Sequence, residues 1–262
     1  EEGPTSDGRM TTGRDASARL YVEHDLGEER SVGLTAAQAH YLKHVLRLAA
    51  GAQVALFNGR HGEWMSRIDT IGRGAGSLWV EEHLRDQVAE PDLWLLFAPI
   101  KRARLDFLVQ KVVELGVSRI SPIYTERTEV KRLNLERHRA NVIEAAEQCE
   151  RLTLPEFTEP CPLAVALENF QSDRQLLVCA ERGEAMPLDA LLHEPEAEGI
   201  SYAFLCGPEG GFSQTELDAF AKLSFIRFVS LGPRILRAET AAVSAVACWQ
   251  AALGDWRRRP PA

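Results

Sequence analysis

Two short stretches combine glycine, proline and charged residues at points where an apolar run ends. The first, GPEGG, occupies positions 207–211 and follows the apolar run SYAFLC. The second, GPRILRAE, occupies positions 232–239 and follows IRFVSL. Glycine permits positive φ and lets a ligand approach the backbone, while proline fixes a turn. The pattern predicts ligand-binding loops; for GPEGG alone, a tight strand-to-helix turn is the alternative.

The second stretch places Arg234, Arg237 and Glu239 among leucine, isoleucine and alanine. A charged group is costly to bury without a partner, so these side chains either pair with one another or point into a site. An Arg237–Glu239 ion pair with a purely structural role is the first possibility. Two Gly-Pro loops at adjacent strand ends, one rich in backbone donors and the other carrying guanidinium groups, favour two walls of one pocket.

The sequence lacks the motifs of several other kinds of site. The sequence has neither GxxxxGK[ST] nor GxGxxG, so a nucleotide triphosphate or nicotinamide site is disfavoured. His40 and His44 have the spacing of metal ligands, but the HExxH glutamate is absent, which favours an amphipathic helix over a metal site. The five cysteines form no CxxC pair, which argues against zinc and against a disulfide framework. We therefore expect reduced thiols and no metal.

The elements that must position these loops fall into two domains of unequal size. Residues 1–18 are polar and are expected to form a flexible tail. Residues 19–86 contain short apolar segments separated by glycines, which predicts a small, mostly antiparallel β barrel. A linker follows at 85–92. From 91 to 256, strand and helix patterns alternate, which predicts a parallel sheet with helices on both faces.

Ligands of such sheets bind beyond the carboxyl ends of the strands, which is where both Gly-Pro loops are expected. Ser213 and Glu216 form a capping-box pattern, so a helix should begin directly after GPEGG.

Charge is unevenly distributed along the chain. The formal net charge is -8, yet residues 91–132 hold eight Lys or Arg against five acidic residues. Residues 134–200 hold fourteen acidic residues against five basic ones. A local basic region is enough to bind nucleic acid, although solvated helix faces explain the same composition. No apolar stretch is long enough for a membrane span, so a soluble cytoplasmic protein is expected.

The paired stretches LCGPEGGFSQTE and SLGPRILRAETAA resemble the motifs of the RsmE-type 16S ribosomal RNA uracil-N3 methyltransferases of the SPOUT superfamily. HYLKHVLRL, FNG, APIKRARLDFLVQKVVELGVSRISPIYTERT and EAAEQCERLTLPE match in the same order, so the resemblance spans about 19–254. It implies an α/β fold: a PUA-like RNA-binding barrel at 19–86 and a SPOUT methyltransferase domain with a deep trefoil knot at 91–256. It also implies a homodimer that methylates N3 of a specific uridine in 16S rRNA or the small ribosomal subunit.

The resemblance implies that S-adenosylmethionine lies against the glycine backbone of the first loop and faces the second. The residues implied to bind it are Ala180, Glu181, Cys206, Gly207, Pro208, Glu209, Gly210, Gly211, Leu231, Gly232, Pro233, Leu236, Arg237, Thr240 and Ala241. The segment after Cys179, CAERGEA, departs from the family pattern.

For catalysis, we expect Arg237 to stabilise the developing N3 anion and Glu239 to orient Arg237 or to accept the proton. The candidate RNA contacts are His40, Arg47, Lys101, Arg102, Arg104 and Arg127. A SPOUT enzyme acting on another nucleoside and a non-catalytic ribosome-binding factor are the alternatives.

Overall fold

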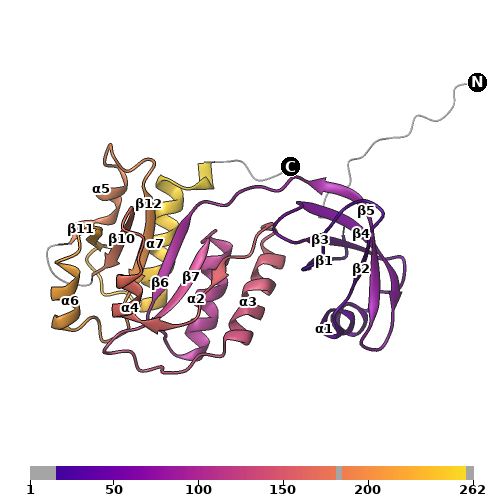
Figure 1. The fold of residues 1–262 in the computed structure, drawn as a ribbon, viewed down its shortest axis with the longest axis horizontal. Coiled ribbons are helices and arrows are strands. Elements are labelled where there is room, and N and C mark those ends of the chain that lie inside the picture. The colour runs from indigo at the N-terminus through magenta and orange to yellow at the C-terminus, as the bar shows by residue number, and fades with distance from the viewer. Residues whose placement is uncertain (1–15, 181–184, 258–262) are drawn as a thin grey trace, which may run out of the picture. The chain divides into compact units, whose positions relative to one another are not determined.

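The computed structural model describes residues 16–180 and 185–257, and its contacts divide the chain into two units, Glu1–Ala89 and Glu90–Ala262 (Figure 1). Most of the expected flexible tail and Glu181 lie outside the described residues. Among the helices of the described part, none is both long and apolar enough to cross a membrane.

The first unit is built on one five-stranded sheet in the order β1-β3-β4-β5-β2. Its β1–β3 pair is parallel, and the other three pairs are antiparallel, so the sheet is mostly antiparallel as the sequence predicts. The short β2 was absent from the predicted elements. The strands are β1 (Ala18–Tyr21), β2 (Ser31–Gly33), β3 (Gln53–Phe57), β4 (Glu63–Ile71) and β5 (Gly76–Arg85).

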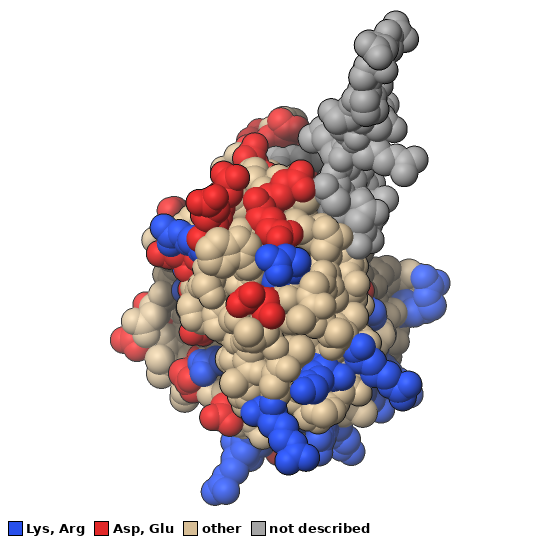
Figure 2. Space-filling view, turned by 90° about the vertical axis from the view of Figure 1, so that its right-hand side faces the viewer, with Lys and Arg blue, Asp and Glu red and all other residues tan. Residues whose placement is uncertain are grey.

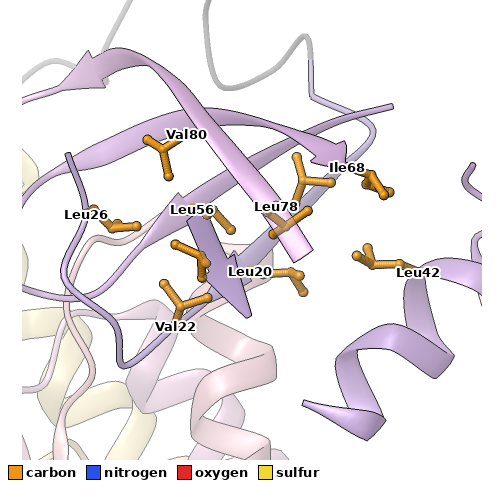
Figure 3. Packing of buried hydrophobic residues seen from close by; sticks show 10 residues of the cluster. Leu20, Val22, Leu26, Leu42, Leu56, Ile68, Leu78 and Val80 are labelled. Atoms are coloured by element: carbon orange, nitrogen blue, oxygen red, sulfur yellow. The ribbon is translucent and has the colours of Figure 1, made fainter. Parts of the chain in front are cut away.

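Apolar side chains from every strand of this sheet form its core. Leu20, Leu56, Ile68 and Leu78 are almost completely buried there, and Leu42 packs against them from the helical segment (Figure 3). Burial of such side chains contributes about 1.5 to 3 kcal/mol each. The core therefore fixes the helical segment to the sheet.

That helical segment is shorter than its sequence pattern predicts. Helix α1 (Ala36–His40) begins at a capping box between Thr35 and Gln38, and the chain then forms the π-helix η2 (Tyr41–Val45). The apolar pattern of TAAQAHYLKHVLRL, residues 35–48, predicts a helix that continues to Leu48. It stops earlier because Arg47 has a φ of 59°, which is incompatible with a right-handed helix.

The second unit contains a sheet in which all neighbouring strands are parallel, in the order β11-β13-β10-β12-β6-β7-β8, with β9 paired to the end of β7. Its strands are β6 (Leu93–Phe97), β7 (Arg119–Tyr124), β8 (Glu156–Phe157), β9 (Cys161–Pro162), β10 (Arg174–Cys179), β11 (Met186–Pro187), β12 (Ser201–Cys206) and β13 (Ile226–Ser230). The five long strands coincide with the apolar runs of the sequence.

Helices cover both faces of this sheet, which explains why the strands are apolar at successive positions. On one face, α4 (Leu163–Glu168) and α6 (Gln214–Phe220) pack on a cluster that includes Leu96 and Val178. On the other face, α2 (Arg102–Glu114), α3 (Leu135–Gln148), α5 (Leu188–Leu192) and α7 (Ala238–Ala252) pack together, and α7 contacts β12. A 3-10 turn, η3 (Asp255–Arg257), ends the described chain.

The strand order determines which loops meet. Strand β10 lies between β12 and β13, and β12 pairs with β6 although more than 100 residues separate them in sequence. Because all these strands are parallel, the loops after β10, β12 and β13 emerge along one edge of the sheet.

Candidate active site

A cavity of about 480 Å³ opens at this edge, within the usual size range of small-molecule sites. It is lined by the ends of β10, β12 and β13 and by the loops that follow them. The lining residues are Arg127, Val178, Cys179, Ala180, Cys206, Gly207, Pro208, Glu209, Gly210, Gly211, Phe212, Leu217, Phe228, Leu231, Gly232, Arg234, Leu236, Ala238 and Ala241. The two Gly-Pro loops thus form two walls of one pocket, as their sequence predicts.

The GPEGG loop is held in a defined conformation. The Arg127 Nη1 atom donates a hydrogen bond of 2.8 Å to the carbonyl of Gly210. The predicted capping box is present: Ser213 and Glu216 exchange hydrogen bonds at the start of α6, and Glu216 also accepts the backbone N–H of Glu126. The segment after β7 therefore braces the loop from outside.

Three positions that line the cavity require glycine, but for different structural reasons. Gly211 has a φ of 66° and Gly232 a φ of 102°, and a Cβ on either would meet no atom within 4 Å. A Cβ on Gly207 would lie 3.0 Å from the Phe212 ring. The first two glycines leave backbone facing open space from opposite walls, which is the surface that a ligand held against the backbone requires.

Cys179 and Cys206 end two neighbouring strands and both line the cavity. A hydrogen bond with Cys179, together with burial, raises the pKa of the Cys206 thiol well above its usual value. The Cys206 thiol is therefore neutral at physiological pH, and its surface in the cavity is weakly polar. It suits an uncharged ring system better than a charged group.

The charged residues of the second loop do not form the Arg237–Glu239 pair considered as an alternative. Arg237 is the exposed N-cap of α7, and within the described residues its side chain makes no ion pair. Glu239 is only 9% exposed. Its Oε1 atom lies 3.7 Å from Nε of Arg104, and its Oε2 atom has no hydrogen-bond partner in the part of the chain that is described.

Arg104 joins the two loops. Its Nη1 atom lies 3.4 Å from Oε1 of Glu209, while its Nε atom faces Glu239. Glu209 belongs to the GPEGG loop and Glu239 to the first turn of α7. A single guanidinium from the start of α2 therefore ties the first wall of the cavity to the helix that follows the second.

Most of the residues predicted to bind the cofactor line the cavity, but some of those in the second loop and in α7 do not. Pro233, Arg237 and Thr240 do not line it, although Leu236 and Ala238 on either side of Arg237 do. Sequence reasoning did not select seven lining residues: Val178, Cys179, Phe212, Leu217, Phe228, Arg234 and Ala238. Arg234 had a signal, since it is a charged residue in the second loop. The other six had none, because apolar residues of the same kinds fill every strand and helix of the domain.

The candidate RNA contacts separate into two kinds. His40, Arg47, Lys101 and Arg102 are exposed and make no ion pair among the described residues, whereas Arg104 and Arg127 bind groups of the cavity loops. Figure 2 shows that Lys and Arg side chains gather in the lower part of the face drawn and Asp and Glu in the upper part. Charge is thus segregated on this surface despite the acidic total.

A parallel sheet with a loop-lined cavity at the carboxyl ends of its strands defines the second unit as a ligand-binding α/β domain. The family model described as an RNA methyltransferase domain matches residues 88–250, and that described as an RNA methyltransferase PUA domain matches residues 34–77. The chain belongs to this RNA methyltransferase family, and its fold is the SPOUT methyltransferase fold with an N-terminal PUA domain.

Individual relatives are similar to this protein along most of its length. It is 33% identical to the ribosomal RNA small subunit methyltransferase E of Rickettsia conorii over 87% of this chain and 93% of that protein. The protein of the same name from a Synechocystis strain is 33% identical over 87% and 76%. The crystal structure of a ribosomal RNA small subunit methyltransferase E from Neisseria gonorrhoeae bound to S-adenosyl methionine superposes with a TM-score of 0.81, at 29% identity, covering 91% of this chain and 99% of that one.

Proposed function

We propose that this protein transfers a methyl group from S-adenosylmethionine to N3 of one uridine in 16S ribosomal RNA, at position 1498 by family resemblance. The observation that carries the proposal is the cavity formed by both Gly-Pro loops, next to the exposed Arg237, which makes no ion pair among the described residues. The names of the relatives support small-subunit ribosomal RNA as the substrate, and the cofactor in the Neisseria structure supports S-adenosylmethionine as the methyl donor.

The residues of the cavity fit this cofactor. Apolar side chains such as Val178, Leu217 and Phe228 offer a surface for the adenine ring, and the open backbone at Gly211 and Gly232 accepts close contact. Arg234 and Glu209 supply opposite charges for the carboxylate and the hydroxyl or ammonium groups. The bound cofactor would supply an electrophilic methyl group on sulfur.

The protein's own residues must then expose the base, remove its N3 proton and stabilise the resulting anion. N3 of uracil carries a proton, so the base must leave its pairing partner and lose that proton. The exposed guanidinium of Arg237 is suited to stabilise the negative charge that develops on the base. Of the two roles expected for Glu239, proton acceptance is the one we propose, because its Oε2 atom has no hydrogen-bond partner among the described residues and no Arg237 contact is found there.

The test compares Arg237→Ala with Arg139→Ala, a change at an exposed arginine of α3 that pairs with Glu159. Methyl transfer to small ribosomal subunits is followed with labelled cofactor, and the modified base is located by mass spectrometry. Arg237→Ala should lower the rate by at least about 100-fold while leaving the cofactor Kd and the fold unchanged. Turnover near that of the wild-type protein would remove Arg237 from the mechanism.

We also propose that the domains at 19–86 and 91–256 act as an RNA-holding barrel and a knotted catalytic domain in a cytoplasmic homodimer. The placement of β12 between β6 and β10 supports a non-sequential chain path of the kind a knot needs. Ser244, Cys248 and Ala251 on α7 are not buried and are small, which suits close packing against a second copy. Light scattering at several concentrations tests the dimer.

A further inference from the structure

A second, smaller pocket lies at the start of α2 and α3. It has a volume of about 260 Å³ and is lined by Ile100, Arg102, Leu105, Val130, Arg132, Leu133, Asn134, Arg137 and His138. Three of these side chains are guanidinium groups and none is acidic. The pocket is separate from the 480 Å³ cavity, since the two share no lining residue.

Two of the three arginines have no acidic partner in the part of the chain that the structure describes. Arg137 pairs with Asp106, which also accepts a hydrogen bond from Asn141. Arg102 and Arg132 are exposed and make no ion pair within the described ranges. These two guanidinium groups are therefore available to an anionic ligand, and they give the pocket a positive potential that attracts one.

A buried histidine provides an independent sign of a ligand. His138 lines the pocket, is 3% exposed and stacks on Phe157 at 5.7 Å between ring centroids. Its Nδ1 atom makes no hydrogen bond to any described residue, and the nearest carboxylate oxygen, Oδ1 of Asp106, is 3.8 Å away. A buried polar atom without a partner is uncommon, and an acceptor group in the pocket would provide one.

The backbone at this point also favours an anion. Helix α3 has 14 residues and begins at the pocket, with Asn134 as its N-cap. The Asn134 side chain accepts the N–H of Arg137, which satisfies only part of the free donors of the first turn. The positive end of the helix dipole and the forked guanidinium groups both match the geometry and charge of a phosphate.

The pocket and the cavity occupy the same edge of the sheet. Strand β6 leads into α2 and β7 leads towards α3, and β6 is the immediate neighbour of β12, whose loop is GPEGG. The first turn of α2 serves both sites, because Arg102 lines the pocket whereas Arg104 binds Glu209 and Glu239. An RNA chain with one base in the cavity would therefore pass close to the pocket.

We propose that this pocket binds a backbone phosphate of the RNA, near the nucleotide whose base is methylated. The phosphate site rests on the geometry described here, and its assignment to RNA rests on the proposed function. Such a contact carries no sequence information; it fixes the register of the strand and so selects which base reaches the cavity.

The test uses Arg102→Gln/Arg132→Gln and a charge-matched control, Arg67→Gln/Arg139→Gln. The control arginines have side chains about half exposed to solvent, and they pair with Glu81 and Glu159. Binding of a single-stranded 16S fragment that contains the target uridine is measured over a range of salt concentrations. The first variant should bind about tenfold more weakly, with a salt slope reduced by about 0.7 to 1, as expected for one lost phosphate contact. Its Kd for S-adenosylmethionine should not change, and the control should stay within about twofold of the wild-type protein.

A direct measurement distinguishes this inference from the proposed function. The ring signals of ¹⁵N-labelled His138, assigned with His138→Gln, are followed while inorganic phosphate or the RNA fragment is added. Both should shift them in the wild-type protein and not in Arg102→Gln/Arg132→Gln. If the wild-type protein binds no RNA, the proposed function fails, and the phosphate titration still decides whether an anion site exists. Shifts with phosphate but an unchanged RNA salt slope would overturn the RNA assignment, and no shift with either would overturn the site.

Discussion

The Nε atom of Arg104 lies 3.7 Å from Oε1 of Glu239, across 135 positions of sequence, and the same guanidinium reaches Glu209 at 3.4 Å. Glu239 is 11% exposed at its side chain, while Arg104 is 36% exposed. The pair links the cofactor loop to the first turn of α7, directly beside Arg237. The geometry of the proposed catalytic arginine therefore depends on a residue of α2.

Replacing Arg104 with methionine should destabilise the protein because Glu239 loses its nearest cation. Loss of one partner of a fully buried pair costs roughly 3 to 5 kcal/mol, and because Arg104 is partly exposed we expect about 1 to 2 kcal/mol. Adding Glu239→Gln should restore part of that loss. Urea unfolding measures the free energies. Lys111→Met breaks the Lys111–Glu114 pair of the same helix and should cost less than about 0.5 kcal/mol, because the Glu114 side chain that it leaves behind is 32% exposed whereas that of Glu239 is 11% exposed. Equal effects of Arg104→Met and Lys111→Met would contradict the linkage.

Arg127 was expected to contact RNA, and its hydrogen bond to Gly210 gives it a second role as a positioning residue for the cofactor loop. Arg127→Ala should weaken S-adenosylmethionine binding by about tenfold, or ~1.4 kcal/mol, because the loop loses its brace. Glu126→Ala is the matched control, since Glu126 holds Glu216 through its backbone N–H, which the substitution keeps. Calorimetry gives both Kd values. A cofactor Kd in Arg127→Ala equal to that of the control would show that the loop needs no brace.

The cavity glycines should respond to alanine in a definite order. Gly211→Ala and Gly232→Ala force a side chain into a positive-φ conformation, which costs about 1 kcal/mol or more, and both place a methyl group in the ligand space. Gly210→Ala should be nearly neutral, because its Cβ would meet Arg127 at an ordinary 3.5 Å and its φ is not positive. Cofactor affinity and thermal unfolding should both rank the variants this way. If Gly210→Ala lost cofactor binding while Gly232→Ala kept it, the cofactor would contact Gly210 and not the open backbone at Gly232, which contradicts this prediction.

The sequence was sufficient for the five long strands of the second unit, for most helices and for both Gly-Pro loops, because these depend on local patterns. Strands such as β12 and helices such as α6 have apolar runs, glycines and a capping box within a few residues of one another. The short strands β2, β8, β9 and β11 were missed, since two or three residues give little pattern. The early end of the helix at Val45 was also missed, because the positive φ of Arg47 has no sequence signal.

Contacts between distant segments could not be predicted in the same way. The Arg104–Glu239 pair and the Arg127–Gly210 hydrogen bond depend on β12 pairing with β6, and nothing near either residue encodes that choice. The lining role of Phe228 likewise follows from the position of β13 beside β10. The two Gly-Pro loops predicted a common pocket from their sequence, whereas the residues that other strands contribute to its walls depend on the strand order.

The free energy of unfolding at acidic pH should depend on the protonation of His138. Burial lowers the pKa of its imidazole below the usual 6.5, and the charges of Arg137 and Arg102 act in the same direction. The groups facing it are Arg102 and Asp106 from α2, Arg132 before α3, and Arg137 on α3, while Phe157 from β8 does not titrate.

As pH falls below 6.5, the unfolded chain binds a proton at His138 before the folded protein does, so the free energy of unfolding decreases until the folded pKa is passed; above 6.5 the residue has no effect. His138→Gln should therefore show a weaker decline between pH 6.5 and the folded pKa than the wild-type protein. Val142→Ala, a buried neutral change one turn along α3, should lower stability by a constant amount at every pH. Urea unfolding at closely spaced pH values gives the three curves. If the His138→Gln curve runs parallel to that of the wild-type protein, the imidazole titrates alike in both states, and its burial carries no electrostatic cost.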